Sequence, residues 1–380
     1  KPKKKIELTR VVRLTALIFI SLSLSLPTET HTARESRIIA PMLAYYLAGA
    51  FVGALTLLVV YLYVVVDRVL AWSVRGKHVV VTGGSSGIGL SVAEQLLRAG
   101  AHVTIMARNP KRLEEAITEL KPFIQAPAQQ KLLSFSADVS DPESIESAMH
   151  KCHAAVGRLD AVVASAGVTK PCRFENLTAR DFQWITDINY LGAVNTVRAA
   201  LPMLKEQKHS RISLVSSMGG LVGVAGFTAY AGSKFAVRGF AEALQMEVRP
   251  FGVRVCVVNP PDVDTPMYQE EMKIKPEECR LISEGSGLFS SEKIAKDIVD
   301  GMRNYRFFVQ TGFDGVFLGW IAAGMSPETS ILSALIQAFG LGLLRIISLS
   351  NIWQYNRICS RVYAKEAANN AKETTSKKTL

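Results

Sequence analysis

The sequence predicts an α/β protein built on a doubly wound parallel sheet, with an N-terminal transmembrane helix and apolar C-terminal membrane-associated helices. Three observations predict this architecture. Short β-branched runs alternate with helical patterns between residues 77 and 310, a glycine-rich turn follows the first run, and apolar segments flank the region on both sides. Apolar strands that alternate with helices form parallel sheets covered on both faces.

The expected strands share an apolar, β-branched composition and are bounded by turn residues. They are His78–Val81, His102–Ala107, Lys131–Ala137, Ala161–Ala164, Arg211–Val215, Val253–Val258 and Tyr305–Val309. Each is separated from the next by a stretch with helical apolar spacing. Residues 77–310 are therefore expected to form one catalytic domain of the Rossmann type.

A charge-free segment, Met42–Val66, precedes this domain. It is long enough to cross the ~30 Å hydrocarbon core as one helix, and its apolar residues lie all round the helix, which disfavours a buried globular helix. Arg68, Arg75 and Lys77 follow it and favour a cytosolic catalytic domain. We interpret residues 42–66 as a transmembrane anchor that opens the natural protein, and residues 1–41 as a doubtful N-terminal extension.

Residues 311–360 form a second apolar region. Its stretches Gly315–Met325 and Ile331–Leu344 are each short for a span, and Arg345 interrupts the second, so interfacial or re-entrant helices are expected. The polar tail, residues 361–380, is expected to be disordered.

The formal net charge is +11, and ten of these charges lie in the basic ends of the chain. Because these ends flank apolar runs, they favour contact with anionic lipid and disfavour a nucleic-acid partner. The five cysteines are scattered and show no CxxC spacing, which disfavours a metal site or a disulfide framework and indicates a reducing compartment.

A phosphate-binding turn is predicted where the first strand meets the first helix. Thr82–Gly89 reads TGGSSGIG, and a helical pattern runs from Leu90 to Arg98. Glycines in this context shape the turn, let backbone amides approach a pyrophosphate and let the helix pack on the sheet. The candidate cofactor-binding residues of the turn are Gly83, Ser85, Ser86, Gly87, Ile88 and Gly89.

The choice of cofactor is expected to depend on the residues after the second strand. Versions that bind NAD carry an acidic residue there, whereas this chain has Arg108, followed by Arg112. Because a guanidinium pairs well with a phosphate, NADPH is the expected cofactor; the alternative is a solvated basic turn. Asp138, at the end of the third strand, is expected to contact the edge of the adenine ring, and Val139 beside it is a further candidate cofactor-binding residue.

The candidate catalytic residues begin with Tyr230 and Lys234, which lie four residues apart on a predicted helix and therefore share a face. A neighbouring ammonium can stabilise a phenolate, and in the reducing direction the phenol can protonate a carbonyl oxygen. Ser217 follows a strand and can hold the substrate oxygen, with Ser216 as the fallback. Asn189 can hold a water that links Lys234 to solvent.

As a set, Thr82–Gly89, Asn189, Ser217, Tyr230 and Lys234 resemble the cofactor motif and catalytic tetrad of the short-chain dehydrogenase/reductase family. The resemblance covers roughly residues 77–310. One departure is that the Asn-Asn-Ala-Gly of the family is Ala-Ser-Ala-Gly at 164–167, which removes an amide that steadies the central sheet.

A narrower resemblance, to the reductases of sphingoid ketones within this family, implies the substrate. It rests on the apolar C-terminal region and on six short motifs: Phe227–Tyr230, Ser233–Ala236, Arg238–Gly239, Ala241–Val248, Pro260–Pro266 and Arg280–Glu284. It implies NADPH-dependent reduction of 3-ketosphinganine to sphinganine, a step of sphingolipid biosynthesis, at the cytosolic face of the endoplasmic reticulum. The alternatives are a membrane-anchored hydroxysteroid or retinol dehydrogenase, and a lipid-binding pseudoenzyme scaffold.

Further expectations concern partners and location. The partners are a long-chain sphingoid ketone and membrane lipid, and a homo-oligomer is compatible with the pattern. The last four residues, Lys377–Leu380, fit a dilysine retrieval signal of endoplasmic reticulum proteins. Asn176 opens a glycosylation sequon, unused in a cytosolic domain, in which Thr178 can start a helix. The segment from Asp262 to Phe289 is expected to be an apolar loop that acts as a lid.

Overall fold

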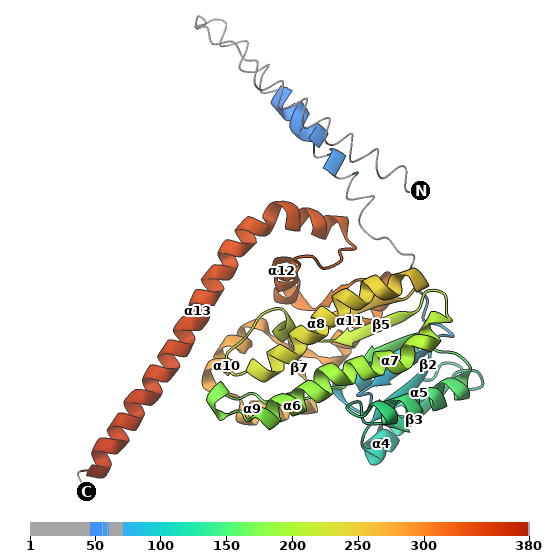
Figure 1. Ribbon diagram of the computed structural model, residues 1–380, viewed down its shortest axis with the longest axis horizontal. Coiled ribbons are helices and arrows are strands. Elements are labelled where there is room, and N and C mark those ends of the chain that lie inside the picture. Colours follow the sequence, from blue (N-terminus) through green and yellow to red (C-terminus); the bar gives the residue numbers. More distant parts are fainter. Residues whose placement is uncertain (1–45, 55, 59, 61–70, 379–380) are drawn as a thin grey trace, which may run out of the picture. The chain divides into compact units, whose positions relative to one another are not determined.

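The computed structural model describes residues 46–54, 56–58, 60 and 71–378, and its centre is a seven-stranded parallel sheet (Figure 1). The strand order is β3-β2-β1-β4-β5-β6-β9, with every neighbouring pair parallel. The strands are β1 (His78–Thr82), β2 (His102–Ala107), β3 (Leu132–Ser136), β4 (Ala161–Ala164), β5 (Arg211–Val215), β6 (Arg254–Asn259) and β9 (Phe308–Gln310). The order turns back between β1 and β4, and such a switch point opens a crevice at the carboxyl ends of the strands.

Helices cover both faces of this sheet, as the near-continuous apolar strands require. One apolar core joins the sheet to α3, α4 and α11, and a second joins it to α5, α7 and α8. The bounds are α3 (Gly87–Arg98), α4 (Pro110–Leu120), α5 (Pro142–Val156), α6 (Ala179–Thr186), α7 (Gly192–Lys205), α8 (Thr228–Val248) and α11 (Ser291–Asn304). The Rossmann-type fold is thereby confirmed.

The last strand lies later in the chain than the sequence pattern predicts. Tyr305 was expected to open it, but Tyr305 ends α11 with a left-handed backbone (φ 47°), and β9 begins at Phe308. The apolar run continues across a helix end, so composition alone misplaces the boundary. Thr178 starts α6 as predicted, with a capping box formed with Asp181.

The segment expected to be a loop that acts as a lid is folded, so the prediction of a loop was wrong, whereas its part as a lid stays a prediction. Residues 262–290 contain β7 (Asp262–Asp264), α9 (Pro266–Ile274), α10 (Glu277–Ser283) and β8 (Leu288–Ser290). Strands β7 and β8 pair in parallel as a separate two-stranded sheet, and this pairing joins the two ends of the segment.

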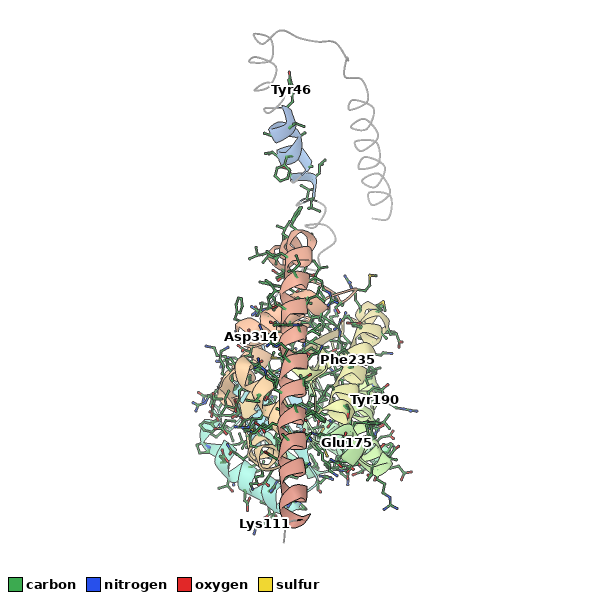
Figure 2. The ribbon with its side chains drawn as sticks, turned by 90° about the vertical axis from the view of Figure 1, so that its left-hand side faces the viewer. Tyr46, Lys111, Glu175, Tyr190, Phe235 and Asp314 are labelled. Carbon is green, nitrogen blue, oxygen red and sulfur yellow. The ribbon has the colours of Figure 1, made fainter. Side chains whose placement is uncertain are left out.

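The C-terminal region also differs from expectation. Helix α12 (Gly312–Ala322) is followed by α13 (Ile331–Lys378), which Figures 1 and 2 show as one continuous helix. Arg345 does not interrupt it, because arginine is a good helix former even where its charge opposes a membrane span. The tail expected to be disordered is helical as far as Lys378, in keeping with its Ala, Lys and Glu content.

Residues 331–370 are long and apolar enough, by length and composition, to cross a membrane. Many large apolar side chains of this helix are exposed, among them Leu332, Phe339, Leu343, Ile346 and Trp353. At the other end of the chain, the described residues between Tyr46 and Leu58 form a shorter apolar helix. The proposed extension at 1–41 lies outside the described residues, as does much of the proposed anchor at 42–66.

Candidate active site

One cavity of about 380 Å³ opens at the carboxyl ends of the central strands. It is lined by every residue that the sequence singled out for cofactor binding or catalysis, except Asn189. These residues come from the turn after β1, the ends of β2 and β3, the segment after β5 and the first turns of α8. The carboxyl ends of parallel strands lie at one edge of the sheet, so residues distant in sequence meet there. This edge therefore holds both the predicted cofactor-binding residues and the predicted catalytic residues.

The glycine turn is shaped by close backbone packing. Gly83 has a left-handed backbone (φ 67°), and a Cβ there would lie 2.8 Å from the Cα of Ala166. A Cβ at Gly89 would lie 2.3 Å from the carbonyl oxygen of Gly83, so the start of α3 packs directly on the turn. Side chains at these positions would collide with backbone, which is the reason that the turn needs glycine.

The start of α3 is suited to an anion. Ser86 occupies the N-cap with extended backbone but makes no side-chain cap bond to the helix. The first amides of a helix lack intrahelical partners and carry the positive end of the helix dipole. The residues of this turn therefore fit the pyrophosphate of a dinucleotide.

Basic side chains border the same end of the cavity. Arg108 follows β2, is about 59% exposed, and its Nη1 lies 4.0 Å from Oδ2 of Asp138 at the end of β3. Arg112 lies in the first turn of α4 and also lines the cavity. The other carboxylate oxygen of Asp138 accepts hydrogen bonds from the backbone and hydroxyl of Ser140, which holds the Asp138 side chain at the cavity edge.

Ser217 and Tyr230 form the centre of the catalytic end. Ser217 begins a 3₁₀ turn two residues after β5, and its Oγ accepts a hydrogen bond of 3.1 Å from the Gly219 amide. Tyr230 lies in the first turn of α8. Burial raises the pKa of the Tyr230 phenol, while a hydrogen bond with Ser217 acts in the opposite direction. The phenol is thus held in its protonated form, suited to giving a proton to a substrate oxygen.

Lys234 lies one turn further along α8, is 4% exposed, and donates a 2.9 Å hydrogen bond from Nζ to the carbonyl oxygen of Val215. Its ammonium lies 5.6 Å from the centre of the Tyr230 ring. Burial lowers the pKa of Lys234 to about 8, because a charged amine loses solvation there. The expected pairing of phenol and ammonium on one helix face is therefore present.

Asn189 and Ser216 lie behind these groups. The Asn189 amide donates to the carbonyl of Val168 and to the Ser233 hydroxyl, and its Oδ1 accepts from the Val168 amide. It lies in a π-helical turn, Asp187–Leu191, and ties the segment after β4 to α8. Ser216 is buried, and its hydroxyl donates to the carbonyl of Lys234. Because the Ser216 hydroxyl is used in this bond, Ser217, which hydrogen-bonds with Tyr230, is the better candidate to hold the substrate oxygen.

Sequence reasoning did not assign several cavity residues as site residues. Thr265 faces the glycine turn, since a Cβ at Gly87 would lie 3.0 Å from its methyl group. It lies beyond the end of β6, so its place after a parallel strand is the signal that could have found it. Glu271 of α9, Leu318 of α12 and Tyr355 of α13 also line the cavity. The last two come from the apolar region, and no local pattern marks them.

Comparison with known proteins agrees with this fold and site. The family described as "short chain dehydrogenase" matches residues 77–275. The chain is 42% identical to a mouse 3-ketodihydrosphingosine reductase over 77% of this chain and 88% of the relative. It is 35% identical to the Arabidopsis thaliana 3-dehydrosphinganine reductase TSC10B over 85% of this chain and 95% of the relative.

A solved structure is similar across most of its own length. It is a short chain dehydrogenase from Mycobacterium paratuberculosis bound to NAD, with a TM-score of 0.55 and 26% identity, and the match covers 61% of this chain and 93% of that one. The parallel sheet, the glycine turn and the Ser217, Tyr230 and Lys234 cluster agree with these matches, and this chain belongs to the short-chain dehydrogenase family of oxidoreductases.

Proposed function

We propose that this protein reduces the ketone of 3-ketodihydrosphingosine to the alcohol, using NADPH. The names of the mouse and Arabidopsis relatives support this substrate. The observation that carries the proposal is that one cavity joins the polar pair Ser217 and Tyr230 to apolar side chains of the C-terminal helices, Leu318 and Tyr355. A long-chain ketone needs both a proton donor at its polar end and an apolar wall for its chain.

The catalytic residues have distinct parts in this reaction. Ser217 holds the carbonyl oxygen by a hydrogen bond, and Tyr230 donates its phenolic proton to the same oxygen as the carbonyl is reduced. A nicotinamide held in this cavity would supply the hydride to the carbonyl carbon. Lys234 stabilises the phenolate left on Tyr230 and can also hold the nicotinamide ribose. Asn189 holds the segment after β4 against α8, and its predicted part in a water link to Lys234 stays a prediction.

The glycine turn and α3 would bind the pyrophosphate, and Arg108 with Arg112 would bind the 2′-phosphate that distinguishes NADPH from NADH. The NAD bound to the M. paratuberculosis dehydrogenase supports a nicotinamide dinucleotide in general. The exposed guanidinium of Arg108 at the cavity edge supports the phosphorylated form, because guanidinium and phosphate pair well. Asp138 and Val139 would contact the adenine ring.

Replacing Arg108 by Ala is expected to raise the KM for NADPH at least tenfold more than the KM for NADH. A charge-assisted hydrogen bond contributes about 1.5–3 kcal/mol, and only NADPH carries the phosphate that would lose it. Steady-state kinetics with both cofactors measure this. Lys111→Ala is the matched control, because Lys111, labelled in Figure 2, carries the same charge on α4 but does not line the cavity. Equal changes for the two cofactors would make Arg108 a solvated surface residue.

The direct test of the proposed function is NADPH oxidation by membranes that contain the full chain, measured with 3-ketodihydrosphingosine, a ketosteroid and retinal. Consumption with the sphingoid ketone, and much less with the other two, is expected. A preference for the steroid or retinal would identify a different dehydrogenase of the same family. If the protein oxidises NADPH with none of the long-chain ketones, the result would instead support the alternative of a lipid-binding scaffold without enzymatic activity.

We also propose the division of the chain and its location. Residues 42–66 anchor the protein, residues 77–310 catalyse, and residues 311–360 contact lipid, at the cytosolic face of the endoplasmic reticulum membrane. Contacts near the end of α13 support an in-plane arrangement of that helix. Arg173 hydrogen-bonds to Glu278 of α10 and to Glu366 of α13, which holds residue 366 on the catalytic domain.

The start of α13 is also held to the domain. Arg238 of α8 hydrogen-bonds to the carbonyl of Ala322 and to Ser326, just before α13 begins. Between its start and Glu366, α13 extends for about 50 Å at ~1.5 Å per residue, well over the ~30 Å of the hydrocarbon core. A helix held to one domain near both ends is better suited to lying along the bilayer surface than to crossing it.

This arrangement predicts that a tag after Leu380 and the domain around Tyr230 are both digested when intact microsomes are treated with protease. The dilysine at Lys377 and Lys378 would also face the cytosol, where retrieval signals are bound. Immunoblots with and without detergent measure this, and mass analysis should find no glycan on Asn176. Protection of either part, or a glycan on Asn176, would place that part in the lumen.

A further inference from the structure

A cluster of charges contributes two carboxylates, Asp262 and Glu271, to one wall of the active-site cavity. At the centre of this cluster is Lys275, whose side chain is fully buried. Its Nζ lies 2.9 Å from Oε1 of Glu271 and 3.3 Å from Oδ2 of Asp262. The rings of Phe227 and Tyr268 lie 5.3 Å and 5.7 Å from the same ammonium. We name Asp262, Glu271 and Lys275 the Lys275 cluster.

The cluster carries more negative than positive charge. Two carboxylates share one ammonium, which leaves a net charge of −1 when both acids are ionised. Glu271 is 9% exposed, and burial raises its pKa even though Lys275 acts to lower it. A buried carboxylate with only half a counter-charge is costly, and a further cation would stabilise it.

The cavity beside this cluster is where a ligand reacts. Asp262 and Glu271 line the same cavity as Ser217 and Tyr230. The cavity is also lined by the ends of the central strands and by the glycine turn, so it is not defined by the charged residues alone. Both carboxylates are close enough to Tyr230 for their charges to raise the pKa of its phenol. Among the described residues, three cations line the cavity: Arg108 and Arg112 border the cofactor end, and Lys234 lies beside Tyr230, where its Nζ donates to the carbonyl oxygen of Val215.

We propose that Glu271, assisted by Asp262, binds an ammonium group on the carbon next to the ketone that Tyr230 reduces. This inference rests on the proposed function, since 3-ketodihydrosphingosine carries an amine at that carbon. The substrate ammonium supplies the positive charge that the Lys275 cluster lacks. It also offsets the carboxylate field at Tyr230. Glu271 is thus the residue that distinguishes an amino ketone from a neutral ketone of the same length.

The test compares two substrates on purified full-length protein in detergent. One is 3-ketodihydrosphingosine, and the other is the same hydroxy ketone without the amine. Glu271→Gln keeps the shape of the side chain and removes its charge, and it is expected to raise KM for the amino ketone about tenfold or more, as for loss of a charge-assisted hydrogen bond. The KM for the neutral ketone should change less than about twofold on the same argument.

The matched control is Glu270→Gln, since Glu270 lies on the same helix, is exposed, and pairs with Lys273. It should leave the ratio of kcat/KM for the two ketones at the wild-type value. Equal losses on both ketones for Glu271→Gln would make Glu271 part of the cavity wall and overturn the inference. Asp262→Asn provides the same comparison if Glu271→Gln does not fold, and an unchanged ratio there would likewise overturn it.

Failure of the proposed function gives a different result. If the wild-type protein reduces the neutral ketone or a steroid but not the amino ketone, the proposed substrate is wrong. If the wild-type protein and Glu271→Gln reduce the amino ketone equally well, the proposed substrate is supported and the proposed role of Glu271 is wrong.

Discussion

Replacement of Tyr230 by Phe is expected to lower kcat by about 10²–10⁴-fold, the range that a positioned general acid contributes. The phenyl ring keeps its place in the first turn of α8, where it packs with Phe227 at a centroid distance of 5.3 Å. Only the proton donor is removed. The Kd for NADPH should therefore stay close to the wild-type value.

Single-turnover kinetics with the ketone, together with a fluorescence titration of NADPH, separate these two effects. Phe227→Leu is a useful companion variant, because it disturbs the packing of the ring but leaves the phenol. A Tyr230→Phe protein with kcat within tenfold of wild type would show that another group protonates the substrate, and Ser217 would then be the first residue to examine.

Replacement of Lys234 by Ala is expected to lower kcat by about 10²-fold or more and to weaken NADPH binding as well. The first effect follows because the phenolate left on Tyr230 loses its neighbouring ammonium, and general acid catalysis depends on that stabilisation. The second follows because the same ammonium is proposed to hold the nicotinamide ribose. Titration of NADPH and measurement of kcat on the same protein check both.

The pH dependence gives an independent check on Lys234. Burial lowers its pKa to about 8, so the ammonium is present below this pH and is lost as the pH rises through it. The kcat/KM profile for the ketone without the amine, which has no titrating group of its own and reports groups of the free enzyme, should therefore fall above about pH 8. Lys234→Ala should lack this limb. A wild-type profile that stays flat to about pH 10 would contradict the requirement for the charged form.

The sequence alone located the strands of the central sheet, apart from the displaced boundary of β9, and the local parts of the site. His102–Ala107, Ala161–Ala164 and Arg211–Val215 were predicted to the residue, because strands buried on both faces are largely apolar, and a polar residue follows each of these three. Tyr230 and Lys234 could be paired because a helix brings residues four apart onto one face. The glycine turn could be placed because its position between strand and helix is itself local.

Helical propensity, rather than polarity, determined the C-terminal part of the chain. Polar composition and Arg345 suggested short helices and a disordered tail, whereas α13 runs to Lys378. The residues of the tail are good helix formers, and contacts distant in sequence stabilise the helix. The guanidinium of Arg173 both pairs with Glu366 and stacks on Tyr363 at 4.3 Å.

The sequence by itself thus determined the fold class, the family and the chemistry of the site, since each depends on residues that are neighbours along the chain or follow successive parallel strands. Only the tertiary structure shows which residues line the part of the cavity that is proposed to hold the substrate. Glu271, Leu318 and Tyr355 come from three separate helices beyond the last catalytic motif and meet at one cavity. No periodicity or spacing encodes such a meeting, because it depends on how α9, α12 and α13 pack after the sheet has formed.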